Sequence, residues 1–321
     1  MDSAGLDLVY AIEMVYYRES RSFPVKRGLL KSLRKALFSC AALLSGIVLF
    51  IPGLPACTLW SAAGESVVGG GTLLAKNRDW IPDHQMRVEL IPPGATGYGY
   101  LCLVAAGRGK AELKAGVNSE GLVYVTASPP SYLEKGKGIL RFYGLGRRIL
   151  AECKTVKEAL SHEDWLVGPR FIMLADRHEV AVIEIGLDGK FLAQSTKSGA
   201  LSHTNHYREP ELDGLNRTRP GVSSVKRCER VQEFLKSKEK FELSDFVQMS
   251  ASTEDGPDNS LWRTGSKPTS PRTLGTWIVH QPTSNEGCLY LKMANPGKEV
   301  KEYRFKLQDV FSGKVNVSGV E

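Results

Sequence analysis

Hydrophobic and polar side chains alternate in short runs through most of the chain after residue 57, and turn-forming residues separate the runs. Alternation with a period of two predicts β-strands that bury one face. Gly69-Gly70-Gly71 separates the first two runs and predicts a hairpin, and the polar residues 176–179 predict another. The expected strands span residues 58–62, 72–77, 98–105, 122–126, 171–175, 180–185, 276–279, 288–293 and 302–307.

Apolar residues recur near helical spacing in three further segments. Residues 144–160 carry such a stripe, residues 225–235 follow Ser223-Ser224, which would cap a helix, and residues 244–249 predict a shorter one. Residues 116–121 predict a turn. Because the strands come in groups with helices between hairpins, rather than in strict alternation, the pattern predicts an α+β layered fold.

The chain before residue 57 has a different pattern. Residues 26–35 are rich in lysine and arginine, residues 36–51 are uncharged and mostly apolar, and helix-breaking residues precede Ala56. This order is typical of a secretion signal. The apolar run is also shorter than a membrane-spanning helix, which needs about 20 residues. An uncleaved leader would instead anchor the protein in the membrane.

We therefore predict a leader, residues 1–56, and one domain, residues 57–321, which is exported to the periplasm or the outside of the cell. Contact with the membrane is expected only through the leader before cleavage. Residues 1–25 are mixed in character and fit either a wrongly assigned start or a cytoplasmic extension.

Composition narrows the function. The net charge is +7 and the pI is near 9.0, but loss of the leader reduces the charge to +4, so we expect no nucleic-acid partner. Of the six cysteines, Cys40 belongs to the leader, and no CxxC motif occurs. We therefore expect no metal and no cofactor. The remaining five cysteines do not define a disulfide pairing.

Cys57 lies on the predicted junction. Cleavage after Ala56 would place a thiol and a free α-amine on the same residue. The amine has a pKa of about 7.7–8.0 and the thiol one of about 8.5, so the amine can take the thiol proton and later give it to a leaving amine. Such a site needs a carboxylate to hold the ammonium, cations near the thiol, and donors for the oxyanion.

Candidates for these roles occur in three segments. Lys76, Arg78 and Asp79 end the second strand of the first hairpin, where alternation places Asp79 on the face opposite the two cations. Residues 202–207 form a polar cluster after an apolar strand, and residues 223–230 carry two arginines on one helix face. The alternative without a catalytic role is that each segment is an ordinary solvent-exposed strand end, loop or helix surface.

Five motifs together resemble the N-terminal nucleophile hydrolases, specifically the choloylglycine hydrolase and acyl-CoA:isopenicillin N acyltransferase (peptidase C45) group. They are Cys57-Thr58, Lys76-Asn77-Arg78-Asp79-Trp80, Gly116-Val117-Asn118-Ser119-Glu120-Gly121-Leu122, and Ser202-His203-Thr204-Asn205-His206-Tyr207 with Ser223-Ser224-Val225-Lys226-Arg227 downstream. The resemblance covers essentially all of residues 57–321.

The resemblance implies a role for each matched position. Cys57 is the nucleophile, Asp79 binds its amine, Asn205 is an oxyanion donor, and the Arg227 guanidinium lies near the thiol.

The match is imperfect at two positions. Lys76 stands where the group has an arginine, with Arg78 as the neighbouring substitute. Ser128 stands where the group has a second oxyanion asparagine, and its hydroxyl or backbone NH would serve instead.

The resemblance also implies a four-layer αββα sandwich of two antiparallel sheets. The implied reaction is hydrolysis of a linear amide, or acyl transfer, through a thioester on Cys57. The substrate is then a small-molecule amide or acyl compound whose identity the sequence leaves open. The exposing cut could be made by signal peptidase or by the chain itself, and a homo-oligomer remains compatible with the sequence.

Two other hypotheses involve the same cysteine. One is a papain-like thiol hydrolase that uses Cys57, Asn205 and either His203 or His206, and it does not need a terminal cysteine. His203 and His206, three residues apart, would also suit a metal, but no acidic residue follows nearby. The other hypothesis is a binding lipoprotein that carries its lipid on Cys57.

Overall fold

The computed structural model describes residues 57–95, 97–107, 111–129, 144–187, 189–216, 220–284 and 286–321. The predicted leader lies outside these residues. The described chain forms two antiparallel β-sheets, and its first residue, Cys57, also begins the first strand.

The first sheet has six strands in the order β10-β1-β2-β11-β12-β13, and every neighbouring pair is antiparallel. The predicted first hairpin is present, with Gly69, Gly70 and Gly71 all at positive φ between its strands, a conformation that glycine adopts without strain. The strands are β1 (Cys57–Ala63), β2 (Thr72–Trp80), β10 (Gly199–His203), β11 (Arg272–Gln281), β12 (Cys288–Met293) and β13 (Lys301–Lys306).

The second sheet has seven strands that pair in the order in which they occur in the chain. Most neighbouring strands are joined by short connections, but the connection from β6 to β7 is long and includes α3 (Leu145–Glu152), α4 (Val156–Ser161) and η2 (Glu163–Trp165). The strands are β3 (Gln85–Ile91), β4 (Tyr100–Ala106), β5 (Glu112–Asn118), β6 (Val123–Ala127), β7 (Arg170–Ala175), β8 (Val180–Ile185) and β9 (Phe191–Thr196).

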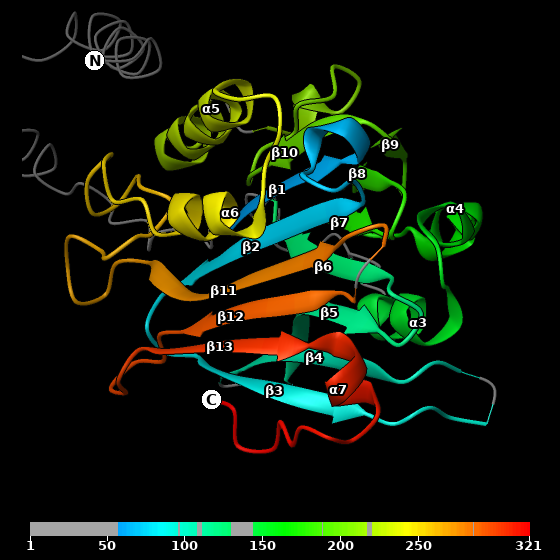
Figure 1. Cartoon of the computed structure of the whole chain (residues 1–321). Helices are drawn as coiled ribbons and strands as arrows, with labels where there is room; N and C mark the ends of the chain where they lie inside the picture. Colours follow the sequence, from blue (N-terminus) through cyan, green and yellow to red (C-terminus); the bar gives the residue numbers. More distant parts are fainter. Residues whose placement is uncertain are drawn as a thin grey trace, which may run out of the picture. The chain divides into compact units, whose positions relative to one another are not determined.

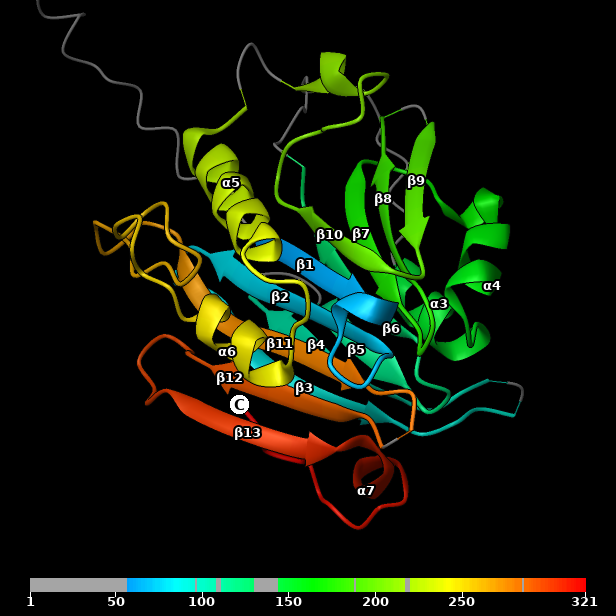
Figure 2. The same cartoon turned by 45° about the horizontal axis from the view of Figure 1, so that its top comes forward.

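Helices cover the outer face of each sheet (Figure 1, Figure 2). α5 contacts β1 and β10, α6 contacts β2 and β11, and α3 contacts β5 and β6. The helices are α3 (Leu145–Glu152), α4 (Val156–Ser161), α5 (Val222–Lys236), α6 (Leu243–Ser250) and α7 (Leu307–Phe311), and the 3-10 turns are η1 (Gly64–Ser66), η2 (Glu163–Trp165) and η3 (Asp213–Leu215).

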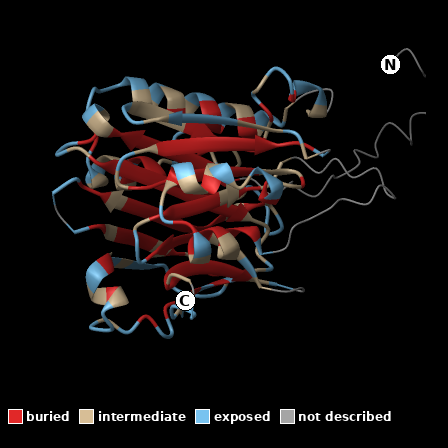
Figure 3. Cartoon of the chain, turned by 90° about the vertical axis from the view of Figure 1, so that its right-hand side faces the viewer, coloured by how far each residue is buried: buried red, intermediate tan, exposed pale blue. Residues whose placement is uncertain are grey.

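Three apolar cores follow from this layering. The largest lies between the sheets and includes Leu74 of β2 and Met173 of β7. A second lies between the seven-stranded sheet and α3 and α4, and a third between the six-stranded sheet and α5 and α6. Figure 3 shows the result, with buried strands between helices whose outer faces are exposed. The predicted four-layer αββα sandwich of two antiparallel sheets is confirmed.

Three local predictions need correction. Gly116 lies inside β5 rather than in a turn, and a Cβ at this position would lie 2.5 Å from Leu150 Cδ1, so the glycine lets α3 pack closely against the strand. Ser223 and Ser224 lie within α5, whose N-cap is Gly221. The segment 144–160 forms two helices rather than one, with a break after Glu152.

Within the described residues, no helix is long and apolar enough to cross a membrane. The five cysteines after the leader are all described, and each carries a free thiol in this structure.

Candidate active site

Cys57 opens β1 at the end of the six-stranded sheet that also holds the end of β2. Its Cα is the register partner of Arg78 across the hairpin, and its side chain is only 4% exposed. The hairpin therefore brings the first described residue beside the polar sequence that ends β2, as the sequence predicted. Asp79, Asn205 and Arg227 are all buried around the same strand end.

The Cys57 thiol lies in a cationic environment. Burial alone would raise its pKa, but the charges of Lys76 and Arg78 and a hydrogen bond from the Asp79 backbone amide outweigh burial and lower the pKa below its ordinary value. Burial also lowers the pKa of Lys76, to about 8, although a Cys57 thiolate opposes this shift. Lys76 Nζ donates to the carbonyl oxygen of Thr126 on the facing sheet, which fixes its position. A lowered thiol pKa is what a thiolate nucleophile requires.

The backbone nitrogen of Cys57 lies in a second set of contacts. It donates to Asn205 Oδ1 at 2.6 Å. Arg227 Nη1 donates to the Cys57 carbonyl oxygen at 2.7 Å and to Thr58 Oγ1 at 2.6 Å, and its Nη2 donates to Asn205 Oδ1 at 3.2 Å. Arg227 and Asn205, which are 22 residues apart, thus clamp the nitrogen, carbonyl and neighbouring hydroxyl at the start of β1.

Asp79 is completely buried on the opposite face of β2 from Lys76. Its Oδ1 accepts from Thr273 Oγ1 at 2.8 Å, and its Oδ2 lies 3.7 Å from Arg263 Nη1 without a hydrogen bond. Burial raises the pKa of Asp79, and the charges of Arg263 and Arg227 oppose that rise. Arg263 and Thr273 were not predicted from the sequence.

A β-bulge explains how Thr273 reaches Asp79. The two residues are register partners between β11 and β2, and the register then shifts between Thr273 and Gly275. The extra residue, Leu274, enters the core between the sheets. Bulges commonly reorient side chains beside functional sites, and this one directs a hydroxyl at a buried carboxylate. Nothing in the sequence around Thr273 signals the bulge.

Ser128 enters the site through its backbone. Its carbonyl oxygen accepts a hydrogen bond from Asn205 Nδ2 at 2.7 Å. The Asn205 side-chain amide is the group that the resemblance assigns to the oxyanion. The predicted contribution of the Ser128 hydroxyl or NH to an oxyanion stays a prediction, and this hydrogen bond adds a role for the Ser128 carbonyl oxygen. Asn205 Nδ2 carries two hydrogens, so it can donate one to this carbonyl and the other to an oxyanion.

His203 is committed to a separate cluster. Its Nε2 lies 2.8 Å from Glu184 Oε1 and its Nδ1 lies 2.9 Å from the Thr204 carbonyl oxygen. Both ring nitrogens therefore face acceptors. His206 Nδ1 lies 2.8 Å from Ser224 Oγ, and burial lowers the pKa of His206 to about 4. Neither ring has a described hydrogen bond to Cys57.

Asn118, in the motif of residues 116–122, has a structural role. Its Oδ1 accepts from the backbone amides of Glu120 and Leu122, and its Nδ2 donates to the carbonyl oxygens of Leu150 and Cys153. The side chain thus closes the turn after β5 and binds the last turn of α3. The motif of residues 116–122, which contributes to the family resemblance, therefore stabilises the fold around β5 and α3.

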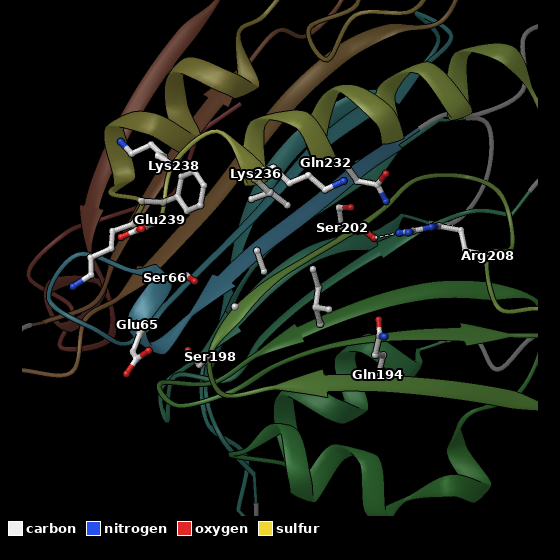
Figure 4. Close-up of a pocket in the computed structure, with 16 residues that line it drawn as sticks. Glu65, Ser66, Gln194, Ser198, Ser202, Arg208, Gln232, Lys236, Lys238 and Glu239 are labelled. Carbon is white, nitrogen blue, oxygen red and sulfur yellow. Dashed lines mark hydrogen bonds between the residues drawn. The ribbon is translucent and has the colours of Figure 1, made fainter.

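A groove of about 820 Å³ lies beside the C-terminal end of α5 and the outer edge of β10 (Figure 4). Two of its lining residues are joined, since Arg208 Nη1 donates to the Ser202 carbonyl oxygen at 2.9 Å. Cys57, Asp79 and Arg227 are not among the described residues that line it. The groove is therefore distinct from the Cys57 cluster.

Solved structures with distant similarity include three enzymes. Penicillin V acylase from Agrobacterium tumefaciens has 16% identity and a TM-score of 0.47, over 78% of this chain and 86% of that chain. A variant of conjugated bile acid hydrolase from Clostridium perfringens has 15% identity and a TM-score of 0.49, over 83% and 95%. The Caenorhabditis elegans ortholog of N-acylethanolamine-hydrolyzing acid amidase has 13% identity and a TM-score of 0.46, over 71% and 94%.

Similarity at this level carries no information on the substrate of this chain, and no curated protein matches it. A family model gives the more informative comparison. It matches residues 67–298, a span that contains Asp79, Asn205, Arg227 and Arg263 and begins ten residues after Cys57. The chain belongs to the acyl-coenzyme A:6-aminopenicillanic acid acyl-transferase family, a group of N-terminal nucleophile enzymes that hydrolyse amide bonds or transfer acyl groups.

Proposed function

We propose that the mature protein is an exported amidohydrolase or acyltransferase that begins at Cys57 and uses the Cys57 thiol as nucleophile and the Cys57 α-amine as base. Its substrate is a small molecule with a linear amide or an activated acyl group. Removal of residues 1–56 creates the amine, so secretion and activation are one event.

One observation carries this proposal. The nitrogen and the sulfur of the same residue lie in two different buried polar environments. The nitrogen contacts Asn205 Oδ1 at 2.6 Å, whereas Lys76 and Arg78 act on the sulfur and lower its pKa. A cysteine that serves only the core would need neither environment, because a buried free thiol behaves as a small apolar group.

The reaction that fits this arrangement has two halves. In the first, the α-amine takes the Sγ proton, Sγ bonds to the substrate carbonyl carbon, and the carbonyl oxygen becomes an oxyanion. The C–N bond then breaks, the ammonium returns the proton to the leaving nitrogen, and a thioester remains. In the second half, water or an amine gives its proton to the α-amine and attacks the thioester, which releases the acid or the new amide and restores the thiol.

Asn205 connects the two halves of the site. Its Oδ1 holds the Cys57 nitrogen, and its Nδ2 is the proposed oxyanion donor. Nδ2 donates one hydrogen to the Ser128 carbonyl oxygen at 2.7 Å, so its second hydrogen is the one proposed to bind the substrate oxyanion. An oxyanion donor of this kind typically contributes about 10²–10³ in kcat.

The papain-like alternative has less support. A general-base histidine needs one ring nitrogen free to accept a proton. Both nitrogens of His203 face acceptors, and His206 Nδ1 contacts Ser224 Oγ. Lipidation of Cys57 would cap the thiol that Lys76 and Arg78 surround.

The first test uses the full chain expressed in a secreting host. Intact-mass analysis of the exported protein should give a chain that begins with unmodified Cys57. The purified protein is then assayed with acyl-CoA compounds, penicillins, bile-salt conjugates and N-acyl amino acids. Cys57→Ala should reduce turnover by at least about 10³-fold without loss of fold, since the residues of a nucleophile–base unit act together.

Cys288→Ala is the matched control, because this partly exposed thiol lies on β12 and should leave turnover unchanged. Full activity in Cys57→Ala would refute the proposal. A mature start other than Cys57 would refute the role of the amine, and a diacylglyceryl mass on Cys57 would establish the lipoprotein instead.

A further inference from the structure

Arg263 and Asp79 form a buried ion pair with poor hydrogen bonding. Their side chains are 5% and 0% exposed, and Arg263 Nη1 lies 3.7 Å from Asp79 Oδ2. Neither of these two atoms has a hydrogen bond within the described residues, and Arg263 Nε also lacks one. Buried charges are normally satisfied by hydrogen bonds, so this pair is held ready for another partner.

The backbone around Arg263 is firmly placed. Its NH donates to Thr273 Oγ1 at 2.8 Å, and its carbonyl oxygen accepts from the Thr273 NH at 2.9 Å. Asn77 Nδ2 donates to the Leu261 carbonyl oxygen at 2.7 Å, two residues earlier. Thr273 therefore binds the backbone of Arg263 and the side chain of Asp79 at once, and the gap between the two charges is set by the fold.

The Cys57 nitrogen, which cleavage would turn into the α-amine, donates to Asn205 Oδ1, and Arg227 Nη2 donates to the same oxygen. The charge of Arg227 also acts on Asp79, so Arg227 links this nitrogen to the ion pair. A buried carboxylate alone would stabilise the ammonium form and raise the pKa of the amine. The amine would then be protonated at neutral pH and could not accept the thiol proton. A nearby fixed positive charge has the opposite effect.

We propose that Arg263 is a positioning residue of the reaction: it neutralises Asp79 before cleavage, and after cleavage it keeps the Cys57 α-amine unprotonated at working pH while Asp79 Oδ2 orients that amine. This rests on the proposed function. It separates two tasks, since Asp79 orients the amine and Arg263 sets the pH at which the amine acts as a base.

Several other charged groups face the same cluster. Lys76 and Arg78 project from β2 and act on the Cys57 thiol, and Lys114 reaches it from β5. Arg227 projects from α5, and the connection after β10 brings His206 near Arg227. His84 contacts Arg78, and Glu184 is occupied by His203. Among the charges that act on Asp79, that of Arg263 is the strongest.

The test is the pH dependence of the processed enzyme. In the wild type, kcat/KM should rise with pH as the α-amine loses its proton. Arg263→Gln removes the positive charge that keeps the α-amine pKa low. The rise of kcat/KM with pH, its acid limb, should therefore move to higher pH by about one unit or more. Arg263→Lys keeps the charge and should retain a limb close to that of the wild type. Arg230 on α5, which is partly exposed and pairs with Asp255, gives the matched control Arg230→Gln, which should cause no shift.

A direct titration keeps this inference separate from the proposed function. The α-amine pKa of the processed protein is measured by ¹⁵N NMR with labelled cysteine, which needs no turnover. A higher amine pKa in Arg263→Gln supports the inference even if no substrate is found. An unchanged or lower amine pKa in Arg263→Gln overturns it, even in an active enzyme. A mature chain that does not begin at Cys57 overturns the proposed function itself.

A second pair of variants keeps the test possible if Arg263→Gln does not fold. If Arg263→Gln is not soluble, the same titration compares Asp79→Asn with Asp79→Asn/Arg263→Gln, which lacks both buried charges. The amine pKa should again rise when Arg263 is removed. An equal pKa in these two proteins would also overturn the inference.

Discussion

Two buried polar clusters lie around the start of β1, and they differ in how completely they are satisfied. In the Glu184–His203 cluster, both carboxylate oxygens and both ring nitrogens have partners, since Glu184 accepts from His203 and from the backbone amides of Arg208 and Glu209. In the Cys57 cluster, Arg78 Nε, Asp79 Oδ2 and two nitrogens of Arg263 lack hydrogen bonds within the described chain.

This difference separates a cluster that stabilises the fold from a cluster that takes part in the proposed reaction. A fully satisfied buried network rigidifies a fold and leaves no atom for a substrate. Unsatisfied buried groups cost stability, and they persist where a ligand or a later chemical step completes them. The Glu184–His203 cluster therefore joins β8 to the connection after β10, whereas the Cys57 cluster is arranged for a partner that arrives after cleavage.

The largest expected effect is on turnover. Asp79→Asn removes the carboxylate proposed to hold the Cys57 amine, and kcat/KM of the processed enzyme should fall by about 10³-fold, within the range of general acid–base contributions. Steady-state kinetics per folded molecule measures this. Asp309→Asn, on α7, is the matched control and should have little effect, and an Asp79→Asn enzyme within about threefold of wild type would contradict the assignment.

The next effect is on stability. Glu184→Gln breaks a buried ion pair with His203 and should lower the free energy of unfolding by about 3 kcal/mol, without a comparable loss of turnover per folded molecule. Urea unfolding measures it. Glu302→Gln removes the exposed pair with Lys292 and should cost less than about 1 kcal/mol.

The same carboxylate gives a pH dependence. Burial alone would raise the pKa of Glu184, but the hydrogen bond and charge of His203 and two backbone amides lower it below its ordinary value of 4.5. A lowered folded-state pKa stabilises the fold above that ordinary value and loses the contribution as pH falls through the folded-state pKa. The stability gap between wild type and Glu184→Gln should therefore narrow below about pH 4.5, and a gap that widened there would be contrary to this account.

The smallest effect concerns the thiol. Lys76→Met removes the charge that lowers the Cys57 pKa most, so that pKa should rise by about one unit, or about 1.4 kcal/mol. The ultraviolet absorbance of the thiolate, as the difference between each protein and its Cys57→Ala variant, measures this. Lys114→Met should give a smaller rise and the peripheral Lys301→Met none, and an equal shift in all three would show that Lys76 has no special place.

The sequence predicted the parts of the site that depend on strand pairing and on motifs. The triple glycine and the alternation on either side defined the first hairpin, which places Cys57 opposite Arg78. Alternation along β2 correctly separated Lys76 from Asp79. Residue patterns indicate the segments that contain Asn205 and Arg227, the resemblance assigns their roles, and the structure brings both residues to Cys57.

Contacts without a local signal were missed. Arg263 reaches Asp79 because a bulge in β11 and a hydrogen bond from Asn77 place its loop, and no motif marks that loop. Ser128 contributes a carbonyl, which every residue has. The glycines and Asn118 predict a turn at Gly116, and nothing in the sequence indicates that α3 packs against this position.

The most direct test of the central claim is the activity of a mature chain with one glycine added before Cys57. The thiol, Lys76 and Arg78 remain in place, but the Cys57 nitrogen becomes an amide and cannot accept a proton. If the α-amine is the base, amide turnover falls by at least about 10²-fold relative to the chain that starts at Cys57. Undiminished turnover in the extended chain would contradict the account and would require a base elsewhere in the site.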